Sequence, residues 1–450
     1  MAKSITLNKG LNIRLDGEAE KIFIKTEISD KYAVKPTDFI GLTPKLLVKE
    51  GDEVKAGSPL FIDKYNPEIN FVSPVSGKVS EIKRGERRRI LEVIIDASKE
   101  IVYNNFEKID IEKASAQEIK TQLLKAGLWT FIIQRPYGII ANPAHTPKSI
   151  FISAFDTAPL APDVDFVMQD DEEFLQKGIN ALKKLTNGVI NLNVNGNYNV
   201  SKVFTHLKNV ELNKIEGIHP AGNVGIQIHH IDPINKGEVV WVINPQDVVA
   251  IGRLFEKRIF DAHRIIALTG SEVIHRKYYK TIIGSSVKTI LKDNVSGNNF
   301  RVISGNVLTG KKIDFEGFIG FYDTQVTVIP EGNHFEFLGW GMPGLNKFSA
   351  SKTFFSWMMP SKKYKLDTNI NGGHRAFVMT NQYEKVVPMD IYPQYLLKAI
   401  LAEDIDKMEQ LGIYEVIEED LALCEFVCTS KIDVQEILRK GLDLVRKEMS

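Results

Sequence analysis

One segment combines aromatic, branched apolar and cationic side chains in a pattern that suits a planar ligand. It reads Leu-Trp-Thr-Phe-Ile-Ile-Gln-Arg-Pro-Tyr over residues 128–137. The flat rings of Trp129 and Phe131 can sandwich a planar group, while Arg135 and Tyr137 can donate hydrogen bonds to its carbonyl oxygens. A quinone head group requires this combination, so we take these four residues as quinone-proximal candidates. The alternative interpretation is a buried strand that ends at the proline.

The chain contains only two cysteines, Cys424 and Cys428, which are one helical turn apart. A helix would place both thiols on one side. An iron–sulfur cluster needs four thiolates, because each iron requires a complete sulfur shell. We therefore interpret the pair as a degenerate cluster motif whose side chains pack as small apolar residues. The alternative is a redox or metal role.

A group of histidines resembles a set of metal ligands. His229, His230 and Asp232 are close in sequence, and His219 lies upstream. Neutral imidazole and carboxylate oxygen are ligands that suit zinc or iron. We expect the adjacent histidines to lie on a strand, where their side chains would point to opposite faces. At most one of them could then join a given site, and we predict no metal centre.

Signatures of catalysis are missing from the sequence. A dinucleotide-binding fold needs G-x-G-x-x-G, because the backbone must approach the pyrophosphate closely. The nearest pattern is Gly222-Asn223-Val224-Gly225, which we interpret as a turn without a ligand. Neither a nucleophile elbow nor a Walker loop occurs, so the hydrolase and kinase classes have no support. We predict no catalytic residue in this chain.

Composition excludes several other classes. The 450 residues include 57 Lys and Arg against 57 Asp and Glu, so no uniformly basic field exists for nucleic acid. The hydrophobic share of 43% is ordinary for a globular protein. No stretch of about 20 apolar residues is present, so we expect the chain not to cross a membrane. The first residues lack a secretory signal, so we expect a cytoplasmic location.

A local basic run stands out against this neutral background. Lys83, Arg84, Arg87, Arg88 and Arg89 lie within seven residues of one another. Such runs are usually solvated turns. The alternative is a docking patch for an acidic partner or for anionic lipid headgroups.

The local pattern changes three times along the chain and predicts a multidomain α/β protein. Residues 1–100 read as short strands with glycine turns in two similar halves, which is typical of a biotinyl/lipoyl-like barrel-sandwich. Residues 101–270 alternate strands with amphipathic helices, which predicts a largely parallel sheet. Residues 271–335 return to strands and suggest a β-grasp-like domain. Residues 336–450 form a C-terminal extension with a helical tail.

Several segments together carry a more specific signal than any single motif. In chain order they are residues 41–52, 73–77, 84–88, 134–136, 142–143, 148–163, 219–222, 241–252 and 420–428. By these segments the chain, from about residue 5 to its end, resembles the NqrA family, the A subunits of the sodium-translocating NADH:quinone oxidoreductase.

The resemblance implies a peripheral subunit on the cytoplasmic side of the bacterial inner membrane. The complex that it implies has six subunits and passes electrons from NADH through flavins and an iron–sulfur centre to quinone while it exports sodium. The implied partners are the membrane subunits, the B subunit first. The resemblance also implies a Rossmann-like second domain, similar to the flavin subunit of respiratory complex I, and an SLBB-type β-grasp third domain.

Two departures from those relatives suggest that electron-carrying sites have been lost. Where the relatives have a glycine-rich flavin loop, residues 126–131 read Ala-Gly-Leu-Trp-Thr-Phe, and only two cysteines remain. We therefore expect a chain that binds no cofactor, with quinone as its candidate ligand and with NADH, flavins and iron–sulfur in partner subunits. The complex is an enzyme, whereas the isolated chain is not expected to be catalytic. The alternatives are a purely structural docking subunit, or a flavin and iron–sulfur carrier like the C subunit of the Rnf-type complex.

Overall fold

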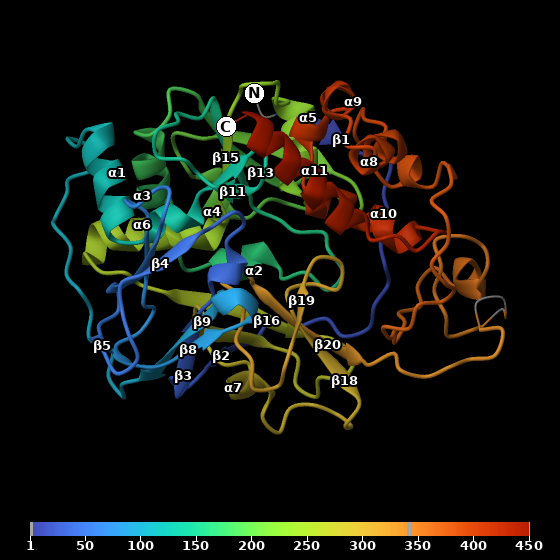
Figure 1. Ribbon diagram of the computed structural model, residues 1–450, viewed down its shortest axis with the longest axis horizontal. Coiled ribbons are helices and arrows are strands. Elements are labelled where there is room, and N and C mark those ends of the chain that lie inside the picture. Colours follow the sequence, from blue (N-terminus) through green and yellow to red (C-terminus); the bar gives the residue numbers. More distant parts are fainter. Residues whose placement is uncertain (1–2, 340–341, 343, 450) are drawn as a thin grey trace.

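The structure, a computed structural model, describes residues 3–339, 342 and 344–449. The strands form four sheets with seven, six, four and three members. Figure 1 shows the seven-stranded sheet in the upper part of the molecule, beside the red C-terminal helices. The blue strands of the small sheets and the yellow and orange strands of the six-stranded sheet lie below them. No helix among the residues described combines the length and the apolar character that crossing a bilayer requires.

The two small sheets face each other as a sandwich, and both are antiparallel. The first contains β3 (Lys31–Val34), β9 (Ile90–Ala97), β8 (Gly77–Arg84) and β5 (Glu53–Val54), and the second contains β4 (Pro44–Leu46), β6 (Pro59–Asp63) and β7 (Asn70–Val72). Buried apolar side chains such as Phe61 and Phe71 fill the interior, with their rings stacked 4.8 Å apart. Leu60 precedes Phe61 in β6 and Val72 follows Phe71 in β7, and all four are buried, so these short strands contribute consecutive apolar residues to the interior.

The seven-stranded sheet has the order β1-β14-β13-β12-β15-β10-β11. Its strands are β1 (Ser4–Thr6), β10 (Ile133–Arg135), β11 (Ile139–Ile140), β12 (Ser149–Ser153), β13 (Val189–Asn195), β14 (Glu211–Glu216) and β15 (Val240–Val242). The first five strands in this order are parallel, and β10 and β11 are antiparallel additions at one edge. The prediction of a largely parallel sheet is therefore confirmed.

Helices cover both faces of this sheet. They are α1 (Ala116–Lys125), α2 (Val164–Met168), α3 (Glu172–Lys183), α4 (Lys202–Thr205), α5 (Val224–Ile231) and α6 (Pro245–Lys257). Ile150 and Ile152 of β12 share a core with α3 and α6, whereas Phe151 packs with α5 on the opposite face. A strand that is buried on both faces reads as a continuous apolar run, which explains its Ser-Ile-Phe-Ile-Ser sequence.

The six-stranded sheet is mixed and has the order β19-β18-β20-β16-β17-β2. It contains β2 (Phe23–Lys25), β16 (His263–Thr269), β17 (Tyr278–Ile282), β18 (Phe300–Ser304), β19 (Lys311–Ile313) and β20 (Gln325–Pro330), with the short helix α7 (Lys288–Leu291). Residues 266, 268, 290, 291 and 326 form part of its separate apolar core.

Three strands pair outside the ranges expected from the sequence. The first strand, β1, joins the α/β sheet through β14, and β2 joins the six-stranded sheet through β17. Residues 1–100 therefore do not all belong to the sandwich. Strand β16 also lies in the six-stranded sheet rather than with residues 101–270. Strands β1 and β2 have only three residues each, and so few residues carry too little alternation to reveal their partners from sequence.

Among the residues described, the C-terminal extension has only short 3₁₀ helices before residue 392 and α-helices after it. Its helices are α8 (Pro393–Leu401), α9 (Ile405–Gln410), α10 (Ala422–Val427) and α11 (Val434–Met449). Short 3₁₀ helices occur at η1 (Pro36–Asp38), η2 (Glu86–Arg88), η3 (Leu128–Phe131), η4 (Phe355–Met358), η5 (Tyr383–Lys385), η6 (Ile413–Glu415) and η7 (Glu418–Leu421). The helices share a core with Phe155, Ile215 and Ile226 of the α/β unit, so the extension is packed against that sheet.

Candidate functional site

A cavity of about 340 Å³ lies at the carboxyl ends of β12 and β15. Ser153 ends β12 and Val242 ends β15, and both residues line the cavity. The chain leaves β12 toward β13 and β14, then returns through α5 to β15 on the other side of β12. Open α/β sheets bind ligands at such a reversal of strand order, because the loops on the two sides diverge there. The cavity therefore occupies the position where this fold most often holds a ligand.

Aromatic and aliphatic side chains form much of the cavity wall. Phe131, Phe155 and Tyr322 line it, together with Ile133 and Ile243. Two side chains predicted from the sequence, Phe131 and Arg135, are among the lining residues. The size and the apolar wall match a small ring-shaped ligand.

The other two predicted residues lie behind or beside the cavity. Trp129 is fully buried, donates its indole N–H to the Ala141 carbonyl oxygen at 2.7 Å, and packs edge-on against Trp241. Tyr137 is half-buried against Tyr414. Neither residue lines the cavity, so the structure brings together Phe131 and Arg135 but not all four candidates.

Arg135 is held by two carboxylates from the C-terminal extension. Its Nη1 donates to Asp420 Oδ2 at 2.8 Å, and its Nη2 donates to Glu419 Oε1 at 2.5 Å. The side chains of Arg135 and Asp420 are 2% and 0% exposed. We call these three residues the buried clamp. Both terminal nitrogens of the guanidinium are thus engaged by the protein itself.

The glycine pattern beside the cavity accommodates the clamp. Asn223 caps α5 and donates its side-chain N–H to the Glu419 carbonyl oxygen at 2.8 Å. A Cβ atom on Gly225 would lie 2.3 Å from an oxygen of Asp420. A helix N-terminus attracts anions, and here the carboxylate of Asp420 packs against its first turn. The sequence Gly222-Asn223-Val224-Gly225 predicted a turn without a ligand. In the structure this segment lines the cavity, and the Asp420 carboxylate packs against Gly225.

Carboxyl groups dominate the polar part of the cavity. Asp156, Asp247 and Glu419 all line it. Desolvation raises the pKa of Asp247 to about 6, despite its ion pair with Arg264. Desolvation also raises the pKa of Glu419 to about 7, although Arg135 opposes this shift. Desolvation also raises the pKa of Asp156, whose side chain is exposed where it lines the cavity. Further negative charge is unfavourable in such a site.

His219 adds a neutral imidazole to the cavity lining. Its Nδ1 lies 3.2 Å from Thr157 Oγ1, which accepts a hydrogen bond from the Gly222 N–H. Burial lowers the pKa of His219 to about 4, so the ring is uncharged at neutral pH. Its Nε2 is buried and has no hydrogen-bond partner among the residues described.

The expectation that His229 and His230 lie on a strand is wrong, because both lie on helix α5. His229 Nδ1 contacts Glu415 Oε2 at 2.6 Å, and His230 Nε2 contacts the Pro388 carbonyl oxygen at 2.7 Å. Within the described ranges, no group of three or more His, Cys, Asp or Glu side chains could hold a metal ion. These histidines instead attach the C-terminal extension to the α/β unit.

Cys424 and Cys428 lie in the apolar core of the C-terminal extension. Cys424 is on α10 and Cys428 follows the last residue of that helix. Both are free and buried, and burial raises the pKa of the Cys424 thiol well above its usual value. A buried thiol with a raised pKa forms little thiolate, which is the reactive form.

Sequence reasoning missed several residues of this cavity. The missed lining residues are Asp156, Asp247, Glu419 and Tyr322. Three of these four are carboxylates that lie on loops or helix starts outside any local motif. Three of the segments that carry the family resemblance contribute to this cavity: 148–163, 241–252 and 420–428. Their joint occurrence was the sequence signal that could have indicated a shared site.

The fold and the cavity define a class: a multidomain α/β protein with a ligand-sized cavity at the carboxyl edge of its parallel sheet. Three family models match the chain. They are described as the NqrA N-terminal barrel-sandwich hybrid domain (residues 5–98), the NqrA second alpha/beta domain (residues 114–259) and the NQRA C-terminal domain (residues 265–314). The predicted barrel-sandwich, α/β and SLBB-type domains are thereby confirmed.

Full-length relatives agree with these models. The chain is 37% identical to the A subunit of the Na(+)-translocating NADH-quinone reductase of Haemophilus influenzae (strain PittGG), over 99% of this chain and 100% of that protein. It is 36% identical to the A subunits of Histophilus somni (strain 2336) and Pasteurella multocida (strain Pm70), with the same coverage. The chain belongs to the NqrA family, the A subunits of the Na(+)-translocating NADH-quinone reductase.

Solved structures give a more distant likeness. A NAD+-reducing [NiFe]-hydrogenase in its air-oxidized state matches with a TM-score of 0.34 and 13% identity, over 52% of each chain. The match is too weak to carry an argument about this site.

Proposed function

We propose that this chain is a peripheral subunit of a complex that couples quinone reduction by NADH to sodium export. The names of its full-length relatives support this assignment. We place it on the cytoplasmic side of the bacterial inner membrane, where it docks on the membrane subunits, most closely on the B subunit. In this proposal the complex is the enzyme, and the chain alone catalyses no reaction.

We further propose that the cavity receives a quinone head group. The observation that carries this proposal is the combination of an aromatic wall with the Asp420 carboxylate at the N-terminus of α5. An uncharged ring can pack against Phe131 and Phe155 without meeting that carboxylate. Arg135 lines the cavity beside Phe131 and holds the extension through Glu419 and Asp420, whereas Trp129 and Tyr137 lie behind or beside the wall.

The position of Asp420 at the N-terminus of α5 also supports the proposal that this chain binds no flavin. We propose that the α/β domain is Rossmann-like, similar to the flavin subunit of complex I, and the strand order β14-β13-β12-β15 supports this. In a Rossmann-like domain a cofactor phosphate sits at a helix N-terminus. Here the acidic lining would repel a phosphate, and residues 128–131 are buried bulky side chains of η3. NADH, flavins and iron–sulfur are therefore assigned to partner subunits.

Calorimetric titration of the full-length chain with a short-tail ubiquinone tests the quinone proposal. We expect saturable one-to-one binding that Phe131→Leu weakens, because the variant loses the ring in the cavity wall. Tyr198→Leu is a matched control, since Tyr198 is exposed and lines a different cavity. Absence of saturable binding would favour the purely structural docking subunit.

The visible spectrum of the purified chain tests the remaining alternative. We expect a colourless protein with no absorbance band at about 450 nm, where a bound flavin would absorb. A yellow or brown protein whose colour survives gel filtration would support a flavin or iron–sulfur carrier like the C subunit of the Rnf-type complex.

A further inference from the structure

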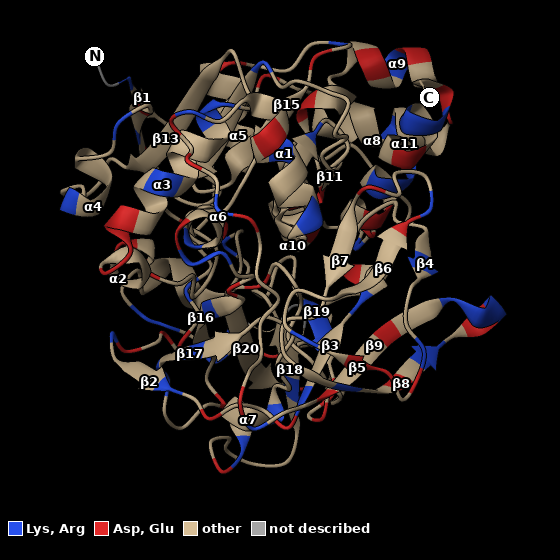
Figure 2. Cartoon of the chain, turned by 90° about the vertical axis from the view of Figure 1, so that its left-hand side faces the viewer, with Lys and Arg blue, Asp and Glu red and all other residues tan. Residues whose placement is uncertain are grey.

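The longest hairpin of the sandwich ends in a cluster of cations. Strands β8 and β9 each have eight residues, and the turn between them contains η2. We call the five residues Lys83, Arg84, Arg87, Arg88 and Arg89 the basic tip, and all five are exposed. Figure 2 shows the β8–β9 hairpin projecting beyond the rest of the chain and ending in blue. The tip is therefore accessible to a partner from several sides.

The backbone of the basic tip is a poor place for arginine on folding grounds. Arg89 N–H donates to the Glu86 carbonyl oxygen at 3.1 Å and closes a turn whose central residues are Arg87 and Arg88. Both central residues have positive φ, 52° and 60°. Turns of this kind favour Asn-Gly, because other side chains are strained at positive φ. Arginine here costs stability, which suggests that the side chains serve an interaction.

The cations of the basic tip are also largely unneutralised. Lys83 lies 3.5 Å from Glu92 and forms the only ion pair of the tip within the described part of the chain. Arg84 donates to the Arg88 carbonyl oxygen at 3.2 Å, which leaves its charge unpaired. The whole chain is formally neutral, so this positive charge is a local feature rather than part of a general basic surface.

We propose that the basic tip binds the phosphate groups of anionic phospholipids at a membrane surface. Residues 83–89 contain no apolar side chain, whereas protein interfaces usually centre on buried aromatic or aliphatic anchors. Arginine presents a planar fork that matches phosphate oxygens, and four of the five cations are arginines. A narrow cationic tip can enter the headgroup layer, where charge attraction alone provides binding. This lipid contact goes beyond the proposed quinone and docking functions and does not depend on them.

Sedimentation of the full-length chain with lipid vesicles tests the proposal. The vesicles contain either phosphatidylglycerol with phosphatidylcholine or phosphatidylcholine alone. The variant is Arg87→Asn with Arg88→Gly, which removes two charges and supplies the sequence that the turn prefers, so it should fold at least as well. A control pair, Lys202→Gln with Lys214→Gln, removes two exposed cations from the α/β unit, where neither forms an ion pair in the part described.

We expect the parent and the control pair to bind the anionic vesicles and to lose binding as salt rises. The tip variant should partition at least about tenfold more weakly. Equal binding of the parent to both vesicle types, or equal binding of the tip variant and the parent, would overturn the proposal. So would a tip that binds a polyglutamate peptide but not the anionic vesicles, since that result would identify an acidic protein as the partner.

Discussion

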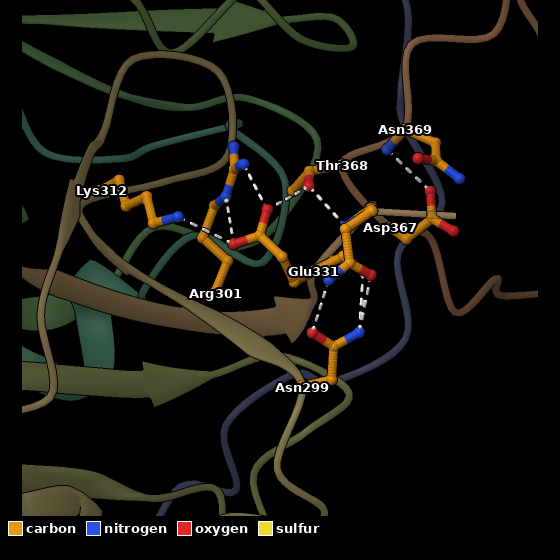
Figure 3. A network of polar contacts seen from close by, with 9 residues as sticks. Asn299, Arg301, Lys312, Glu331, Asp367, Thr368 and Asn369 are labelled. Atoms are coloured by element: carbon orange, nitrogen blue, oxygen red, sulfur yellow. Dashed lines mark hydrogen bonds and ion pairs between the residues drawn. The ribbon is translucent and has the colours of Figure 1, made fainter. Parts of the chain in front are cut away.

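Two clusters of charged side chains contact the C-terminal extension, and they differ in the burial of their arginines: the Arg135 side chain is 2% exposed and the Arg301 side chain is 32% exposed. The buried clamp joins Arg135 of the α/β sheet to Glu419 and Asp420. The second cluster, shown in Figure 3, joins Arg301 and Lys312 of the six-stranded sheet to Glu331. Thr368 of the extension also donates to Glu331, at 3.0 Å. We call this second group the Glu331 network.

The two carboxylates respond to their arginines in opposite directions. Hydrogen bonds, above all from Arg301, lower the pKa of Glu331 to about 2. In the buried clamp, desolvation outweighs the attraction of Arg135 and raises the pKa of Glu419 to about 7. The attraction of an arginine therefore lowers the pKa of a carboxylate only where it exceeds desolvation and the repulsion of neighbouring carboxylates, such as Asp420 beside Glu419. The buried clamp joins the extension to the sheet beside the cavity through a buried arginine, while the Glu331 network reaches the extension only through the hydrogen bond from Thr368, within the part of the chain described.

The largest effect should come from removing the cation of the buried clamp. Arg135→Met leaves Asp420 buried without its partner, so we expect a loss of about 3–5 kcal/mol in the free energy of unfolding, measured by urea denaturation. The triple variant Arg135→Met, Glu419→Gln, Asp420→Asn should recover most of that loss, because no buried charge remains unpaired. A loss below about 1 kcal/mol for Arg135→Met would mean that burial does not distinguish the two clusters.

A smaller loss should follow from adding one methyl group beside the clamp. Gly225→Ala would place its Cβ within 2.3 Å of an Asp420 oxygen. We expect a cost of about 1–3 kcal/mol by thermal or urea unfolding, because the carboxylate is held by Arg135 and cannot move freely. Gly373→Ala is the control, since nothing lies within 4 Å of its Cβ position. Similar stabilities for the two variants would show that Asp420 is not fixed.

Ionisation of Glu419 should lower the stability of the fold, whereas ionisation of Glu331 should raise it, so the two clusters should differ in how stability depends on pH. The folded pKa of Glu419, about 7, lies above its usual value of 4.5, so its ionisation opposes folding as pH rises through that window. Relative to the parent, Glu419→Gln should therefore gain stability between pH 4.5 and about 7. Urea unfolding at a series of pH values measures this difference. A constant difference across the window would contradict the raised pKa.

The smallest effect is expected at the Glu331 network. Glu331→Gln should cost only about 0.2–1 kcal/mol at neutral pH, because the ion pairs are partly solvated. The folded pKa of Glu331, about 2, lies below its usual 4.5, so its contribution is present above pH 4.5 and is lost as pH falls toward 2. The stability difference between parent and variant should shrink over that range. A difference that grows on acidification would reverse the assigned direction.

Local chemistry made part of the fold predictable. Ser115 followed three residues later by Glu118 is a capping-box sequence, and this capping box begins α1 in the structure. Pro245 after Asn244 similarly marked the start of α6. These signals depend on residues within one turn of each other, so no tertiary information is needed to read them.

Helix α5 shows where local reasoning failed. The expected strand at His229 and His230 is a helix, although the preceding residues Val224, Ile226 and Ile228 alternate as they would in a strand. Asn223, which occupies the N-cap position, was a signal for a helix that the alternation obscured. Both faces of this short helix are buried over its first turns, which removes the usual amphipathic period.

The buried clamp could not have been predicted from local patterns. Arg135 and Asp420 are 285 residues apart, and neither lies in a motif whose spacing implies the other. The sequence predicted Phe131 and Arg135 as site residues from their side-chain chemistry. Their burial and, for Arg135, the pairing with distant Glu419 and Asp420 determine their roles in the structure. The contact between Asp420 and Gly225 likewise depends on long-range packing that no local pattern indicates.

The most direct test of the central claim compares two ligands for the same cavity. The full-length chain is titrated calorimetrically with a short-tail ubiquinone and, separately, with riboflavin 5′-phosphate. Because the Asp420 carboxylate is at the N-terminus of α5 and the cavity is acidic, we expect saturable binding of the quinone and none of the phosphate-bearing flavin. Tight flavin binding that displaces the quinone would contradict the account.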